Sequence, residues 1–157
     1  MLQRPSRAKL RSLLNAVPEA HRQFIRNLEP MIEEPDMVVA HAMWEIYEPN
    51  DAPFVSDRLM EHADRRHTLL WGRYVDAEVA SPKAWSRPMF FGHTPVGNYA
   101  ATRGSRMVPV VGPSIVMLDT AAALGGRLTA YCVETGRFLQ ADPRGRMVAP
   151  EPAAEAR

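Results

Sequence analysis

Two apolar runs of strand length, each with a histidine at its C-terminal end, constrain most strongly what this chain can fold into. The runs are "DMVVAHA" (36–42) and "RPMFFGH" (87–93), and they place His41 and His93 at the ends of two predicted strands. In the sheets of α/β proteins, sites are built at the carboxyl ends of strands, because the loops converge there while the sheet holds them rigid. The two runs therefore predict an α/β fold that carries an imidazole at the end of each of two strands.

Amphipathic spacing predicts helices before and between these strands. A first helix is predicted from Ser6 to the residue before Pro18, and a second from Pro18 to Pro30. Their apolar faces are formed by Leu10, Leu13, Leu14 and Val17 in the first and by Phe24, Ile25 and Leu28 in the second. Residues 56–74 are charged with embedded apolar positions, and we expect part of this segment to be helical.

The C-terminal part of the chain is predicted to be rich in strands. Three strands are expected within 114–120, 126–135 and 137–142, and "TGR" (135–137) joins the last two in a hairpin. The segment "RMVPVVG" (106–112) is expected to be a short edge strand, because Pro109 cannot donate to a ladder. We expect "EPMIEEPD" (29–36) to precede the first strand as a loop. The tail 143–157, rich in proline, alanine and charge, is expected to be disordered.

Composition and charge narrow the classes of function. With 157 residues the chain fits one domain, and its net charge of +1 gives no bulk attraction to nucleic acid or to an anionic membrane. No segment has the apolar length of a signal peptide or a membrane span. The single cysteine, Cys132, cannot form an internal disulfide and is expected to be a buried, inert thiol. We therefore expect a cytoplasmic protein that binds neither nucleic acid nor membranes.

The two strand-end histidines allow two interpretations, and the sequence leaves both open. Imidazole suits Zn²⁺, Mn²⁺ or Fe, so His41 and His93 are a candidate metal pair. Alternatively, each histidine satisfies a loop carbonyl and has no further role. Gly92 precedes His93 and permits backbone geometry that aims the imidazole. Other conspicuous side chains favour structural roles, a charged helix surface for His62 and His67 and core or loop anchors for Trp44, Trp71 and Trp85.

Four motifs follow one another within residues 36–133. They are "VVAHAMW", "LLWGRY", "FFGHTPV" and "IVMLDTAAALGGRLTAY". In this order they resemble the C-terminal half of the calcineurin-like metallophosphoesterases, in the branch of the serine/threonine protein phosphatases and bacterial diadenosine tetraphosphatases. That branch typically shows V-H-A-G, L-W-x-R, F-G-H-T-P and D-T-G-x-x-x-G-G-x-L-T.

The resemblance implies a fold and a site. It implies that residues 1–142 form the C-terminal half of a two-sheet sandwich flanked by helices. It also implies that His41 and His93 bind one metal of a dinuclear centre, with Mn, Fe or Zn as the divalent metal. Arg73 would contact the substrate phosphate, for which a planar guanidinium is suited. The implied partner is a phosphorylated substrate, either a phosphoprotein or a small phosphate ester.

The sequence also departs from the family pattern. It lacks G-D-x-H-G, G-D-x-x-D-R-G and G-N-H-E, which supply the remaining metal ligands in the family. Met43 and Ala121 stand where the matched motifs have glycine, and Asp119 lies in a motif that is a structural strand end in the family. Two histidines and an arginine cannot hold two ions and a bridging hydroxide. We therefore expect a metal-dependent phosphoesterase in a truncated form that is inactive alone.

Three accounts of the missing ligands stay open. A start upstream of Met1 would make the whole product an ordinary phosphatase that hydrolyses phosphate monoesters. A degenerate, non-catalytic protein would instead use the fold as a binding or regulatory module. In the third account, a separate chain completes the site between subunits. We also expect the isolated chain to self-associate through a sheet edge that the missing half leaves uncovered.

Overall fold

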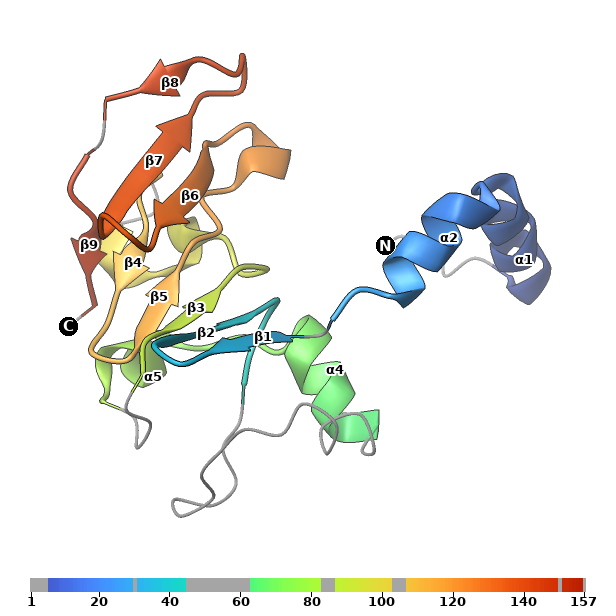
Figure 1. Ribbon diagram of the computed structural model, residues 1–157, viewed down its shortest axis with the longest axis horizontal. Coiled ribbons are helices and arrows are strands. Elements are labelled where there is room, and N and C mark those ends of the chain that lie inside the picture. The colour runs from blue at the N-terminus through green and yellow to red at the C-terminus, as the bar shows by residue number, and fades with distance from the viewer. Residues whose placement is uncertain are drawn as a thin grey trace.

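Two β-sheets form the body of the chain, and two N-terminal helices project from it (Figure 1). The computed structural model describes residues 6–29, 31–44, 63–82, 87–102, 107–149 and 151–156. Within these residues one sheet is mixed and the other is antiparallel, so the fold is mixed α/β. No helix of the described part is both long and apolar enough to cross a lipid bilayer.

The N-terminal helices form where the spacing of apolar residues predicts them. Helix α1 is Arg7–Ala16, and the side chain of Ser6 caps it by accepting a hydrogen bond of 3.3 Å from the Lys9 amide. Helix α2 is Glu19–Arg26 and begins directly after Pro18. Both predicted helices are confirmed.

Three parallel strands form the centre of the larger sheet. They are β2 (Met37–Ala40), β3 (Met89–Phe91) and β5 (Ile115–Met117), and the order of the whole sheet is β1-β2-β3-β5-β4-β9. Ala40, Phe91 and Met117 lie level with one another in the register. The strands predicted within 36–42, 87–93 and 114–120 are therefore confirmed, and their carboxyl ends lie side by side.

The segment 29–36 differs from its expected loop. Met31–Glu34 forms strand β1, which pairs antiparallel with β2 and places Met31 opposite Ala40. The side chain of Met31 is only 4% exposed, and its burial in the core holds the strand. The two prolines and three glutamates of 29–36 concealed this strand, because its order comes from tertiary pairing rather than from local propensity.

The C-terminal tail also differs from expectation. Residues 143–157 were expected to be disordered, but they contain β8 (Met147–Val148) and β9 (Ala154–Glu155). Strand β9 pairs in parallel with β4 (Val110–Val111), and the Ala154 amide donates a hydrogen bond of 2.8 Å to the Pro109 carbonyl. Strand β4 therefore lies inside the sheet rather than at its edge. Pro109 is accommodated because its carbonyl, not an amide, serves the ladder.

The smaller sheet consists of β6 (Leu128–Cys132), β7 (Arg137–Ala141) and β8. The predicted β6–β7 hairpin is confirmed, and Gly136 in its turn has a φ of 64° that suits glycine. The ring of Tyr131 packs 4.8 Å from that of Phe90 in the larger sheet, which joins the two sheets face to face. Cys132, expected to be buried, is only half-buried.

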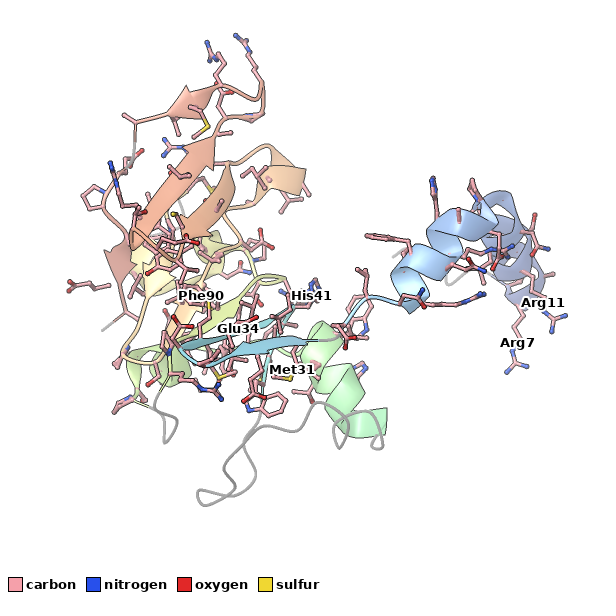
Figure 2. All side chains as sticks on the ribbon, viewed as in Figure 1. Arg7, Arg11, Met31, Glu34, His41 and Phe90 are labelled. Atoms are coloured by element: carbon pink, nitrogen blue, oxygen red, sulfur yellow. The ribbon has the colours of Figure 1, made fainter. Side chains whose placement is uncertain are left out.

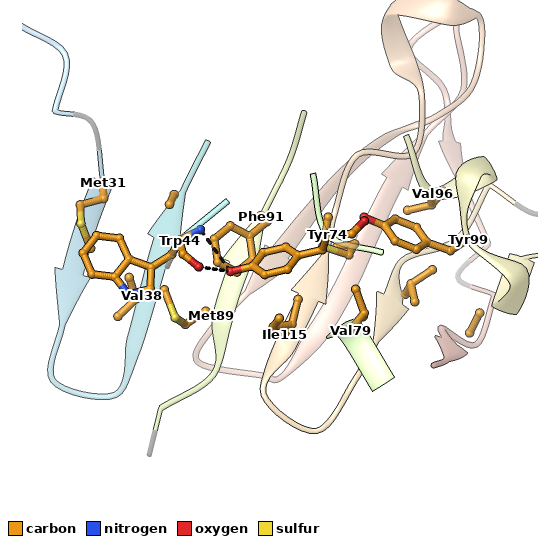
Figure 3. Packing of buried hydrophobic residues seen from close by; sticks show 14 of the residues in the cluster. Met31, Val38, Trp44, Tyr74, Val79, Met89, Phe91, Val96, Tyr99 and Ile115 are labelled. Atoms are coloured by element: carbon orange, nitrogen blue, oxygen red, sulfur yellow. Dashed lines mark hydrogen bonds between the residues drawn. The ribbon is translucent and has the colours of Figure 1, made fainter. Parts of the chain in front are cut away.

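The main core lies on the other face of the larger sheet, where α4 (Ala63–Trp71) and α5 (Asp76–Ala80) cover it. Figure 3 shows Tyr74 at the centre of this core, with its hydroxyl accepting from the Trp44 amide at 3.1 Å and donating to the Trp44 carbonyl at 2.6 Å. Three short 3₁₀ helices also lie in the described part of the chain: η1 (Val96–Asn98), η2 (Ala100–Thr102) and η3 (Ala122–Leu124). The helix predicted within 56–74 is confirmed as α4.

Candidate metal and phosphate site

A polar residue follows each of the three parallel strands. His41 comes directly after β2, and His93 and Asp119 come two residues after β3 and β5. Because these strands are parallel and level in the register, the three residues lie at the same end of the sheet. Figure 2 shows His41 at this end, close to α4.

The structure brings together the two histidines that the sequence paired. Nε2 of His41 lies 3.2 Å from Nδ1 of His93, and the ring centroids are 4.9 Å apart. The backbone fixes this approach, since the Gly92 amide donates a hydrogen bond of 3.0 Å to the His41 carbonyl. His93 has a φ of 62°, a left-handed conformation that is strained for a residue with a β-carbon. This strained conformation turns the side chain of His93 toward His41.

The distance between the two nitrogens fits coordination of a single ion. Two nitrogens that each lie about 2.1 Å from one metal, at angles of about 90° to 109°, are about 3.0 to 3.4 Å apart. The observed 3.2 Å falls inside this range. It equally fits one neutral imidazole donating a hydrogen bond to the other. Within the described residues there is no group of three or more His, Cys, Asp or Glu placed to bind an ion, so the pair alone is an incomplete metal site there.

The electrostatic surroundings favour a neutral His93. Burial lowers the pKa of His93 first, and the neighbouring His41 and Arg73 lower it further, whereas Asp119 opposes them. A neutral imidazole is the form that binds a metal. Nε2 of His93 is buried and has no hydrogen-bond partner among the described residues.

Arg73 lies close enough to act on His93 and remains available to a ligand. It follows α4, is exposed, and makes no ion pair or hydrogen bond with any described residue. The end of α4 is held against β2, because the Ala42 amide donates a hydrogen bond of 3.0 Å to the Leu69 carbonyl. Gly72 permits this approach, since a β-carbon there would lie 2.6 Å from Cβ of Met43. Met43 therefore fits beside the end of α4 because Gly72 has no side chain.

Trp71 is the residue of this site that the sequence did not identify. It was expected to be a core or loop anchor, but it is 62% exposed, and its ring lies 5.7 Å from that of His93 in an edge-to-face arrangement. Trp44, by contrast, is buried in the core as expected. The residue type alone does not distinguish Trp44 from Trp71, and the exposure of Trp71 follows from how α4 packs on the sheet. Trp85 lies outside the described residues.

Asp119 has a structural role in the turn after β5. Its Oδ1 accepts a hydrogen bond of 3.0 Å from the Ala121 amide, and its carbonyl accepts one of 2.8 Å from Val96. Ala121 stands where the motif of the family that the sequence resembles has glycine, and its φ of 63° is the conformation that glycine adopts without strain. His67 is exposed, consistent with a charged surface, and His62 lies outside the described residues.

Comparisons with known proteins identify no family for this chain. No model of a known protein family matches the chain, and no curated protein matches it.

Proposed function

We propose that this chain contributes part of a metal-dependent phosphoesterase centre that hydrolyses phosphate monoesters. In this proposal His41 and His93 bind one divalent ion, Mn, Fe or Zn, and Arg73 binds the phosphate of a phosphoprotein or small phosphate ester. The observation that carries it is the 3.2 Å separation of the two imidazole nitrogens at the ends of adjacent parallel strands. The chain's architecture would then be the C-terminal half of a metallophosphoesterase-type sandwich.

Each residue would have a distinct task. A divalent ion, when bound, would polarise a phosphoryl oxygen and lower the pKa of bound water. His41 and His93 would hold the ion from one side, aided by the lowered pKa of His93, which keeps that ring neutral. The exposed guanidinium of Arg73 would donate hydrogen bonds to two phosphate oxygens and orient the ester.

A non-catalytic phosphatase-like binding or regulatory module is the second candidate. The small number of metal ligands favours this candidate, because the described residues offer the two histidines and no third ligand beside them. Such a module would bind a phosphorylated partner through Arg73 without turning it over. Binding without hydrolysis separates this candidate from the first.

Metal titration of the purified chain tests the metal pair. Co²⁺ replaces Zn²⁺ at nitrogen sites and reports its ligands by visible absorption, so we expect a weak Co²⁺ spectrum that His93→Ala and His41→Ala abolish. The matched control is His67→Ala, which removes an exposed imidazole outside the pair and should leave the spectrum unchanged. Equal binding by wild type and His93→Ala would contradict the proposal.

Hydrolysis of 4-nitrophenyl phosphate with added Mn²⁺ tests whether the chain alone is active. We expect no rate above background from residues 1–157, because most of the stabilisation in this chemistry is electrostatic and the pair cannot hold two ions. Turnover that a chelator or His93→Ala removes would show a complete site and would move the catalytic proposal to the isolated chain.

A further inference from the structure

The N-terminal helices present an apolar face that nothing in the described chain covers. We call residues 6–29, with α1 and α2, the helical hairpin; none of its side chains that the structure describes is buried. Five of its described large apolar side chains are between 54% and 66% exposed: Leu13, Leu14, Phe24, Ile25 and Leu28. Figure 1 shows the hairpin and the three-stranded sheet at opposite ends of the molecule, so the two do not meet within one chain.

The three-stranded sheet has a second apolar surface. Its inner face carries Tyr131 and Phe138, which lie toward Phe90 of the larger sheet. Successive residues of a strand point to opposite faces, and directly paired residues point to the same face. The register therefore places the following residues on the outer face, which is apolar except for one arginine: Leu128, Ala130, Cys132, Arg137, Leu139, Ala141 and Met147.

This outer face is open in the structure. Leu128 and Met147 are each 66% exposed, and Leu139 is 48% exposed. An apolar sheet face is buried against a second layer in globular proteins, and a pair of helices is one such layer. The chain thus has one uncovered helical face and one uncovered sheet face, which are complementary in kind.

We propose that the helical hairpin of one copy packs on the outer face of the three-stranded sheet of a second copy, reciprocally, in a twofold dimer. The area supports the reciprocal form. The five exposed side chains of the hairpin and the three of the outer face offer about 100 Å² each, so a one-way contact buries about 800 Å². That is the size of incidental contacts, whereas two such contacts bury about 1,600 Å², which is typical of a stable interface.

Charge disfavours a second hairpin as the occupant more than it disfavours the sheet. The hairpin has five cationic residues against two acidic ones: Arg7, Lys9, Arg11, Arg22 and Arg26 against Glu19 and Glu29. Figure 2 shows Arg7 and Arg11 projecting from α1. Two hairpins would therefore repel each other. Residues 128–148 have three arginines against two acidic residues and come closer to neutrality, so they repel a hairpin less. This dimer does not depend on the metal proposal.

Light scattering of the whole chain tests the dimer. We expect a mass twice the 17.6 kDa of one chain. The double variant Phe24→Gln/Ile25→Gln and the double variant Leu128→Glu/Leu139→Lys should each be monomeric, with unchanged circular dichroism. Ile32→Gln is the matched control, because Ile32 is also an exposed apolar residue, at 53%, but lies on β1 outside both surfaces. Wild-type monomers, or a dimer that persists in either double variant, would overturn the proposal.

Cross-linking tests the pairing of surfaces even if one of those variants fails to fold. Cys132 is the only cysteine and lies on the outer face. We expect Leu14→Cys to give a covalent dimer under mild oxidation with copper phenanthroline, and Ser12→Cys, two residues away on the opposite side of α1, to give at least tenfold less. Equal cross-linking from both positions would contradict the proposed orientation. Cross-linking of the Leu14→Cys variant that persists after Cys132→Ser would show hairpin contacting hairpin and would also overturn it.

Discussion

Gly112 packs directly against the backbone of Val79. A β-carbon at position 112 would lie 1.9 Å from the Val79 carbonyl oxygen, a distance no folded structure tolerates. The contact joins the turn between β4 and β5 to the end of α5, and Val79 is fully buried there. The position of α5 on the sheet therefore depends on the absence of a side chain at Gly112.

Gly112→Ala should destabilise the fold by about 2 kcal/mol or more, because α5 must move and leave buried apolar surface unpacked. Urea unfolding followed by circular dichroism measures the change. Gly92→Ala is the control, since a β-carbon there would meet the His41 carbonyl at an ordinary 3.4 Å. Equal unfolding midpoints for the two variants would contradict the claim that the contact of Gly112 with Val79 positions α5.

Ala121→Gly should stabilise the fold by about 0.5 to 1 kcal/mol. Ala121 has a φ of 63°, and a left-handed alanine is strained by about 1 to 2 kcal/mol, which exceeds the added backbone entropy of glycine in the unfolded chain. Ala122→Gly, one residue further on in η3 and without a positive φ, should instead be neutral or destabilising. Thermal unfolding of both variants checks the sign.

Stability should fall in alkaline solution through Tyr99. Burial raises the pKa of Tyr99 to about 12, and its hydroxyl donates a hydrogen bond of 3.2 Å to the Tyr74 carbonyl. An unfolded tyrosine ionises near pH 10, so the stabilisation is complete below about pH 10 and is lost as the pH rises toward 12. The free energy of unfolding of wild type and Tyr99→Phe, measured across this range, should converge as the pH rises. A constant difference would contradict the shifted pKa.

Arg73→Ala should weaken the binding of inorganic phosphate to the metal-loaded chain by about tenfold, the effect of losing one charge-assisted contact. Arg73→Lys should restore only part of it, because an ammonium cannot bind two oxygens in a fork. Isothermal titration measures both, with Arg144→Ala as an exposed arginine of the β7–β8 turn for comparison. Equal losses for Arg73→Ala and Arg144→Ala would point to bulk charge and against a phosphate-binding role.

Local chemistry decided which parts of the structure could be predicted. Helix α1 was predictable because the Ser6 cap and the apolar spacing act within a few residues. The meeting of His41 and His93 was predictable because both end apolar runs, and parallel strands share an end. Strands β1 and β9 were missed because partners elsewhere in the chain stabilise them, and the exposure of Trp71 depends on how α4 docks, which periodicity does not encode.

The pairing of β9 with β4 has a consequence for how the protein is made. Ala154 is 4% exposed and forms part of the core, yet it is synthesised well after its partner strand β4. A ribosome holds the most recently added residues in its exit tunnel, so β4 waits with one side unpaired until that stretch emerges. Folding of the larger sheet must therefore finish after β9 has emerged, and a released chain that ends at Val148 should remain protease-sensitive around Val110.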